Sequence, residues 1–552
     1  MKNEPHHSKA TGQEAALSAF RRCDQFAYWA ALLAVLIWAA RLRFQWPPDP
    51  VADGDIGGYL LSGIGKLLGN GFIHVRRNFV YPGWLYLLLR CFSDFRAITI
   101  AQHALGLVAG VLFLATWCEI RKFYRAPRIP YSLYRWLGLL VAAIYLFALE
   151  PIRLEGELRP EGLCGFLVIL SIFLVVRFTW RSLARPHPKI AVSCGSALIF
   201  TATLLVFVKP SMGLAAAGAF VPVALALLWR RDARATICLG AAAGATALLL
   251  VVPESLLARG DETQITFLPT DLFMIHAAQI RDQMADDLAA NLSDVPSRSW
   301  LSRISNSLAT EIDKAAAFNG KNYPTLGFDP DYLMYRDGST DFQLREEFHG
   351  NIEALCAFYR DYYWRTWRQH PVRMLDKIGR QLRTFYGPIC PAYNAVQKFP
   401  MADDYAASAV ALGTPDWFAV WSRYAPAMEL INRTTELATS GPTLLQSKHL
   451  RRCLSCLAVT YRWVLFASMG SGLVILGVSS LRSRWCWIVA LVLFLFWYNF
   501  GSCLEVAVLH TLDVVRYRTV QLIFTLLAQA TAILLLVELV LDALSRASRR
   551  GW

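Results

Sequence analysis

Charged residues are scarce in this chain. Of its 552 residues, 17% are Asp, Glu, Lys or Arg, 55% are hydrophobic, and the mean hydropathy is +0.36. Soluble globular domains carry about 25% charged residues, so the composition argues against a soluble enzyme and favours a membrane protein. The first hydrophobic run is too long for a signal-peptide core and no small-residue cleavage site follows it, so we interpret it as an uncleaved anchor.

Metal and redox motifs are also lacking. Twelve cysteines are scattered, mostly within hydrophobic runs, where cysteine behaves as a small hydrophobe. Cys453 and Cys456 have the spacing of half a zinc site, but no second pair or histidine stands nearby, and no histidines and carboxylates have metal-ligand spacing. Cys356 and Cys390 fall in a long outer segment, where an oxidising compartment would permit a disulfide that the sequence alone does not establish.

Hydrophobic runs dominate what is present. About ten of them approach the 20 or so residues that a bilayer-spanning helix needs. They lie near residues 26–44, 97–117, 137–150, 162–176, 190–208, 214–229, 235–252, 461–481, 485–503 and 520–543. The third and fourth are short but are kept, because a bilayer can thin around a short helix. The expected fold class is an all-α polytopic membrane protein.

Basic residues follow alternate runs. Clusters occur before the first run and after the second, fourth, sixth, eighth and tenth, for example Arg121, Lys122 and Arg125 after the second. Because basic loops tend to stay in the cytoplasm, both termini are predicted to be cytoplasmic. Much of the net charge of +14 is then explained by topology, and we expect no nucleic-acid partner.

Two loops on the predicted outer side are too long to be connectors. The first covers residues 45–96 and divides the N-terminal transmembrane module, residues 1–258. The second gives a mainly helical outer domain, residues 259–458, followed by C-terminal helices in 459–552. Its clearest helical periodicity lies at 299–318 and 340–386, and a basic amphipathic stretch from Pro371 fits equally a helix on the membrane surface and a helix packed within the domain.

Ionisable residues gather at four outer span ends, where charge near hydrocarbon tends to mark function. The clusters contain Asp53 and Asp55; Glu155 and Glu161 with Arg159; Lys209; and His510, Asp513, Arg516 and Arg518. All four open to the same predicted face and are expected to converge on one cavity. Carboxylates suit a general base or sugar hydroxyls, and Arg and Lys suit a phosphate, as transfer from a lipid-linked phosphosugar requires.

These motifs carry a resemblance to a known family. Asp55-x-x-x-Tyr59 in a long first outer loop, followed by Arg76-Arg77 and Tyr81-Pro82, resembles the GT-C superfamily of polyprenyl-phosphate-dependent glycosyltransferases. Arg159-Pro-Glu161, Lys209-Pro210 and Arg516-Tyr517-Arg518 are also similar to its pattern, particularly that of the lipid A aminoarabinose and protein O-mannosyl transferase branch. The resemblance covers roughly residues 24–258 and 460–540, and the outer domain matches no pattern.

The resemblance implies a GT-C-like core of about ten helices, with two further helices in the first loop, and a sugar donor on undecaprenyl or decaprenyl phosphate. It assigns Asp55 as the catalytic base of an inverting transfer, with Asp53 as second candidate. Sugar-binding residues would be Glu155, Glu161, Tyr59 and Tyr81, and lipid-phosphate-binding residues Arg76, Arg77, Lys209, Arg516 and Arg518. The acceptor would be a cell-envelope glycan, lipid or protein, with the active site facing the periplasm across a bacterial inner membrane.

Each assignment has an alternative. Asp53-Gly-Asp55 is also typical of a turn, the charged residues of 150–161 could form a solvated loop, and Arg516 and Arg518 could be interfacial anchors. A transporter or lipid-linked-glycan flippase would share many spans and a charged cavity, and a sensory protein would use the outer domain as a binding module. No cofactor or metal site is assigned. A divalent cation held through Asp55 and the glutamates of the 150–161 loop stays open.

Overall fold

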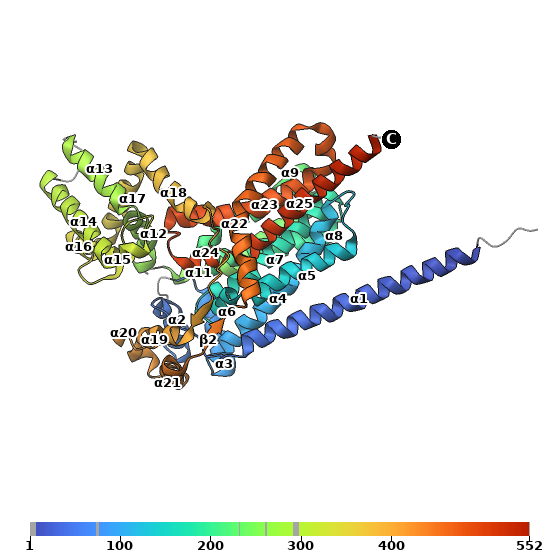
Figure 1. Cartoon of the computed structure of the whole chain (residues 1–552). Coiled ribbons are helices and arrows are strands. Elements are labelled where there is room, and N and C mark those ends of the chain that lie inside the picture. The colour runs from blue at the N-terminus through green and yellow to red at the C-terminus, as the bar shows by residue number, and fades with distance from the viewer. Residues whose placement is uncertain (1–6, 73–76, 231, 260–261, 291–296, 551–552) are drawn as a thin grey trace, which may run out of the picture.

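The structure is a computed structural model that describes residues 7–72, 77–230, 232–259, 262–290 and 297–550. Within them the chain forms helices and one short antiparallel ladder (Figure 1). Nine of the described helices are long and apolar enough to cross a membrane, and one bent pair would make a tenth span. The chain is therefore an all-α polytopic membrane protein, as its hydrophobic runs predict, since a helix satisfies its own backbone hydrogen bonds in lipid.

The membrane bundle has α7 at its centre, packed against α4, α8, α9 and α25. Its helices are α1 (His7–Phe44), α4 (Arg96–Ile120), α5 (Tyr131–Phe147), α6 (Leu149–Glu155), α7 (Glu161–Thr179), α8 (Pro188–Val208), α9 (Gly213–Arg230), α10 (Ala233–Thr246), α11 (Val252–Leu257), α22 (Lys448–Gly477), α23 (Ser479–Leu509) and α25 (Leu522–Arg550). The N-terminal half of α1 extends beyond the rest of the bundle (Figure 1).

The two short runs differ from the expectation in informative ways. The third is the pair α5 and α6, bent by 53° at Ala148. Pro151 lies in the first turn of α6, where its missing N–H costs nothing, whereas in a continuous helix it would break a hydrogen bond. The fourth is longer than its apolar run, because α7 continues through a π turn to Ala184 and includes Arg177 and Arg181.

The first loop contains two helices, α2 (Ile56–Leu67) and α3 (Val80–Phe92), that lie at one end of the bundle (Figure 1). Asp53, Gly54 and Asp55 form the turn that precedes α2, in which the Ile56 N–H donates to the Asp53 carbonyl at 3.0 Å. A single bridge between Val51 and Glu157 joins this loop to the segment between α6 and α7. The turn is thereby held beside the second charged loop.

The segment between α11 and α22 forms two lobes at this same end (Figure 1). The first lobe, residues 262–369, has its own core and consists of α12 (Glu262–Ile275), α13 (Ala277–Ala289), α14 (Arg298–Asn319), α15 (Pro330–Tyr335), α16 (Thr340–Glu347) and α17 (Ile352–Gln369). The second lobe, residues 398–445, consists of β1 (Lys398–Pro400), α19 (Met401–Leu412), α20 (Pro415–Trp421), α21 (Ala425–Ser440) and β2 (Thr443–Leu445), with β1 and β2 paired antiparallel.

Helix α18 (Pro371–Tyr386) connects the lobes and packs on α23 of the bundle. It is the basic amphipathic stretch, and its buried face includes Lys377 and Phe385. The Ile378 and Phe385 side of its apolar stripe is buried, whereas Val372 and Leu375 of the same stripe are exposed, so the stretch combines a packed end with an apolar surface.

All twelve cysteines lie in the described residues and all are free. Cys356 is buried in α17 beside the Ile265 carbonyl, while the Cys390 N–H donates to the Ala458 carbonyl near the start of the bundle. The disulfide between Cys356 and Cys390 that the sequence left open is not formed, because the two residues belong to different parts of the fold.

Candidate functional site

A cavity of about 720 Å³ lies where the bundle, the first loop and both lobes meet. This volume is in the range of small-molecule sites. Its lining residues are Asp53, Gly54, Asp55, Gly58, Arg77, Arg159, Phe267, Asp271, Asp331, Tyr335, Trp417, His510, Arg516 and Tyr517. They come from seven separate stretches of sequence, so the cavity exists only in the assembled fold.

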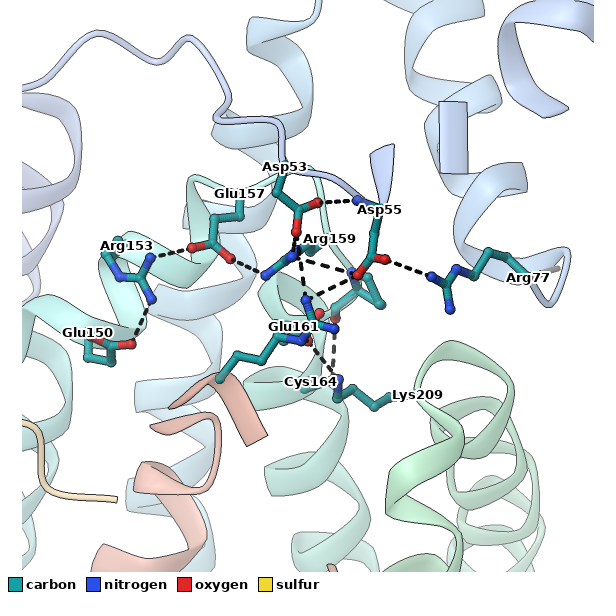
Figure 2. Close-up of polar contacts among 12 residues, drawn as sticks. Asp53, Asp55, Arg77, Glu150, Arg153, Glu157, Arg159, Glu161, Cys164 and Lys209 are labelled. Carbon is teal, nitrogen blue, oxygen red and sulfur yellow. Dashed lines mark hydrogen bonds and ion pairs between the residues drawn. The ribbon is translucent and has the colours of Figure 1, made fainter. Parts of the chain in front are cut away.

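Asp55 stands at the centre of the bundle-side wall. It is the N-cap residue of α2, yet its side chain makes no cap hydrogen bond and points to basic side chains instead. Its carboxylate lies 3.0 Å from Arg77 Nη2, 3.1 Å from Arg516 Nη1 and 3.6 Å from Arg159 Nη2. Asp53 pairs with Arg159 (Figure 2). It also lies 3.7 Å from Arg516 Nη1. The motif is therefore a turn, and both of its carboxylates face basic side chains at the cavity.

Arg77 is held from two sides. Its guanidinium lies 5.1 Å from the centre of the Tyr59 ring and 5.9 Å from that of Phe267 in the first lobe. Burial alone would lower the pKa of Arg77, but nearby Tyr59 and Asp55 outweigh it and the pKa is raised. The following residues fix the loop to the bundle, since Asn78 donates to the Phe207 carbonyl at 3.2 Å. Arg77 is thus a permanent cation at the cavity edge.

Below this wall lies a buried ion pair. Glu161 Oε1 accepts from Lys209 Nζ at 2.6 Å (Figure 2). The same oxygen lies 3.8 Å from Arg516 Nε. The Lys209 ammonium also lies 4.6 Å from the centre of the Tyr517 ring. Glu161 Oε2 is buried and has no hydrogen-bond partner among the described residues. This pair supports Arg516 and Tyr517 from beneath.

The segment that carries Arg516 is held by the region between the lobes. Lys377 on α18 donates to the carbonyls of Ala507 and His510, at 2.6 and 3.2 Å, at the carboxyl end of α23. The carboxyl end of a helix stabilises a cation. Burial acts in the opposite direction and prevails, so the pKa of the Lys377 ammonium is lowered to about 7. Gln381 accepts from the Leu512 N–H and donates to the Thr511 hydroxyl at 2.9 Å. Helix α18 therefore fixes residues 507–512, just before Arg516.

His510 presents a neutral ring to the cavity. Burial, with Arg516 and Lys377 nearby, lowers its pKa to about 3. Its Nδ1 accepts from the Thr511 N–H at 2.8 Å, so the proton of the neutral imidazole is assigned to Nε2. His510 can consequently donate a hydrogen bond but cannot act as a cation here.

The lobes supply the opposite wall. Phe267 and Asp271 come from α12, Asp331 and Tyr335 from α15, and Trp417 from α20. Asp331 is exposed to the cavity while protein surrounds it on its other sides. Desolvation, with Asp329 and Asp55 nearby, raises its pKa to about 6. This wall thus carries carboxylates and aromatic rings.

The structure brings most of the expected site residues together. Asp53, Asp55, Arg77 and Arg516 line the cavity, and Glu161, Lys209 and Tyr59 contact lining residues. Arg76 lies outside the described residues. Arg518 donates to the Asp513 carbonyl at 3.1 Å, and Tyr81 donates to Gln102 at 3.4 Å. Neither of these last two lines the cavity, because each is turned to a partner elsewhere.

Glu155 lies away from the cavity, contrary to the sugar-binding role expected for it. Its oxygens accept from Arg43 Nε and Nη2 at 2.8 and 2.9 Å, and His103 Nδ1 lies 2.9 Å from Oε2. Both Arg43 and Glu155 are buried among α1, α4 and α6. The solvated-loop alternative is equally wrong for Glu155, which belongs to a sealed ion pair inside the bundle.

Several lining residues were not predicted as site residues. Arg159 and His510 stood within predicted clusters, and their position at an outer span end was a usable signal. Asp271, Asp331, Tyr335 and Trp417 come from the segment without a recognisable pattern, so nothing in the sequence indicated them. In the described residues no three His, Cys, Asp or Glu side chains are grouped to hold a metal, and Asp53 and Asp55 face guanidinium groups.

Comparisons with known proteins assign no family. The chain matches no family model, no curated protein and no solved structure. Any function for this cavity therefore rests on the residues that line it.

Proposed function

We propose that this protein is an integral membrane glycosyltransferase of GT-C type that moves a sugar from a polyprenyl-phosphate donor to a hydroxyl acceptor with inversion. One observation carries the proposal. Asp55 lines a large cavity at the end of the membrane bundle, and three guanidinium groups lie within 4 Å of its carboxylate. A general base and a phosphate-binding group are the two chemical elements that this reaction needs.

In the proposed step Asp55 takes the proton of the acceptor hydroxyl. The acceptor oxygen then forms a bond to the anomeric carbon while the bond from that carbon to the phosphate oxygen breaks. The electron pair of the broken bond leaves with the polyprenyl phosphate. Attack from the face opposite the leaving group inverts the anomeric configuration.

The basic residues fit this leaving group. On the bundle side of the cavity, Arg77, Arg159 and Arg516 face the two carboxylates of Asp53 and Asp55, which leaves an excess of one positive charge on that side alone. A phosphodiester donor carries one negative charge, and the departing phosphate gains a second as the bond breaks. Guanidinium groups bind such oxygens through paired hydrogen bonds, so they stabilise the transition state more than the bound donor.

The ion pairs of Asp55 also fit a cycle of binding. Without donor, Arg77 and Arg516 hold the Asp55 carboxylate. A bound phosphate competes for the same guanidinium groups and frees Asp55 to accept a proton. Arg159 and Arg516 each lie within 4 Å of both Asp53 and Asp55, so we assign these two guanidinium groups to the phosphate. Glu161, paired with Lys209, supports Arg516 from beneath.

The placement of the charged ends supports a cavity on the non-cytoplasmic side, which would be the periplasm if the membrane is a bacterial inner membrane, as we propose. At the other end of the bundle, Arg128, Arg484 and Arg546 surround Asp542 at 2.8 to 3.1 Å. Basic loops tend to remain in the cytoplasm, so the cavity would face the opposite compartment.

The test is transfer from a panel of radiolabelled polyprenyl-phosphate sugars to membrane extracts, comparing the purified wild type with Asp55→Asn. We expect a loss of roughly 10²- to 10⁴-fold, the usual effect of removing a general base. Asp94→Asn is the matched control, because Asp94 pairs with Arg96 outside the cavity and its loss should leave transfer unchanged.

Two results would contradict parts of the proposal. Full transfer by Asp55→Asn would move the base to Asp53 or Asp331. No transfer by the wild type with any donor would favour a transporter or flippase.

A further inference from the structure

The two walls of the cavity differ in charge. The bundle wall carries three guanidinium groups, those of Arg77, Arg159 and Arg516, against the two carboxylates of Asp53 and Asp55. The lobe wall has two carboxylates, Asp271 and Asp331, and none of its described lining residues is a lysine or arginine. A phosphate-bearing donor is therefore attracted to one wall and repelled by the other. The lobe wall is left for a different ligand.

Trp417 is fixed in place on this wall. Its indole lies so close to α2 that a Cβ added at Gly57 would stand 2.3 Å from the ring. Trp421, one turn later, is fully buried and donates its Nε1–H to the Leu412 carbonyl at 2.9 Å. The Trp417 ring thus has one side packed on backbone and lines the cavity with the rest, which gives a rigid apolar surface.

Asp331 is not needed by the helix that carries it. Asp329, not Asp331, caps α15 by accepting from the Asp331 N–H at 3.0 Å. Asp331 makes no ion pair within the part of the chain that the structure describes, although Arg77 and Arg516 stand nearby. Its carboxylate is exposed to the cavity and can accept hydrogen bonds from a ligand.

We propose that the lobe wall, formed by Phe267, Asp271, Asp331, Tyr335 and Trp417, is a saccharide subsite that holds the acceptor. A sugar ring has faces of C–H groups and an edge of hydroxyls. The faces pack on aromatic rings through dispersion and apolar burial, and the hydroxyls donate to carboxylates. The role as acceptor site rests on the proposed glycosyl transfer, in which the bound hydroxyl lies between this wall and Asp55.

The charge and the size of the cavity favour this ligand class. Anionic acceptors such as phospholipid headgroups would meet the exposed Asp331 carboxylate at close range and be repelled. The volume of about 720 Å³ leaves room for a donor sugar and an acceptor sugar together. A neutral saccharide fits both conditions.

Saturation-transfer NMR on the full-length protein in lipid nanodiscs tests the subsite without requiring turnover. The probes are methyl pyranosides, methyl furanosides and their disaccharides, with a serine-containing hexapeptide as the competing acceptor class. We expect at least one saccharide to bind the wild type, and roughly tenfold weaker binding to Asp331→Asn and Trp417→Leu. Trp417→Phe should keep most of the binding, because the aromatic face remains.

Matched controls lie elsewhere in the lobes. Asp337→Asn and Trp364→Leu change exposed residues that do not line the cavity and should bind saccharide like the wild type. Saccharides that bind no protein, that bind all variants equally, or that bind less well than the hexapeptide would overturn the inference.

The same experiment separates this inference from the proposed function. Asp55→Asn should keep saccharide binding through the lobe wall, because the amide can still accept a hydrogen bond from the hydroxyl, while transfer falls by roughly 10²- to 10⁴-fold. If the wild type transfers sugar but binds no saccharide, the saccharide subsite is contradicted and the proposed transferase function is not. If the wild type binds saccharide, Asp331→Asn weakens this binding, and no donor supports transfer, the subsite is supported and the transferase function is contradicted.

Discussion

Two clusters in this protein pair carboxylates with arginine, and they differ in their access to solvent. In the sealed cluster the side chains of Arg43 and Glu155 are 0% and 4% exposed, and Arg43 also donates to the Leu146 carbonyl at 2.9 Å. In the cavity cluster the side chains of Asp55 and Arg77 are 29% and 27% exposed. The same residue types thus serve the fold in one place and face a ligand-sized space in the other.

The comparison teaches that charge near the membrane is not by itself a sign of catalysis. Both clusters satisfy the rule that buried charge is paired. Only the cavity cluster leaves its groups where a substrate could replace an existing partner. Accessibility, more than pairing, separates a site from a structural ion pair.

The largest expected difference between the clusters is in stability. Arg43→Met leaves Glu155 buried without its main partner, and we expect a loss of about 3–5 kcal/mol, seen as a much lower midpoint of thermal unfolding. Asp55→Asn should lower stability by about 1 kcal/mol or less, because its pairs are partly exposed.

The double variant Arg43→Met/Glu155→Gln serves as the control and should recover part of the loss. Equal shifts for Arg43→Met and Asp55→Asn would mean that the two clusters do not differ as the exposures indicate.

A smaller effect should follow from loosening the cavity cluster at a distance. Lys377→Met keeps the length of the side chain but removes its hydrogen bonds to the Ala507 and His510 carbonyls. Because these bonds fix the segment before Arg516, we expect a raised KM for the donor and transfer reduced roughly tenfold, or about 1–2 kcal/mol.

Lys314→Met on α14 is the matched control, since Lys314 pairs with Glu311 away from the cavity. An unchanged KM in Lys377→Met, with lowered stability alone, would show that Lys377 only holds the fold.

The smallest effect concerns pH. The pKa of Asp331 is raised to about 6, chiefly by desolvation, so saccharide binding through its carboxylate should weaken several-fold as pH falls from 7 to 5. Stability should move the opposite way. The folded state holds this proton more tightly than the unfolded state, so the contribution of Asp331 to stability rises as pH falls from about 6 toward 4.

Asp331→Asn should bind saccharide weakly at every pH between 5 and 7. A wild-type affinity that stays constant over this range would remove the Asp331 carboxylate from the binding contacts.

The sequence predicted the membrane bundle well because hydrophobic runs and their length are local properties. It also predicted that Asp55, Arg77 and Arg516 gather, because span ends on one side of a membrane share one face. It did not separate Glu155 from Asp55, because side-chain direction depends on tertiary packing. It could not indicate Asp331 and Trp417, since these residues have no local pattern and meet the bundle only through the folded lobes.

Helix ends likewise include some that the local sequence predicts and some that it does not. Pro371 marked the start of α18 correctly, because proline is favoured in a first helical turn. The stretch 340–386 was read as one periodic region, yet it is three helices, with turns around Gly350 and His370. The bend at Ala148 depends on Pro151 three residues later, which a search for hydrophobic length does not detect.

The hydrogen bonds from α18 to residues 507–512 couple the position of the lobes to that of the bundle. A shift of α18 would drag the carbonyl end of α23 with it and move Arg516 relative to Asp55. The lobes therefore position charges of the bundle as well as lining the cavity. If the membrane and lobe portions were expressed separately, neither piece would contain the complete set of charged lining residues.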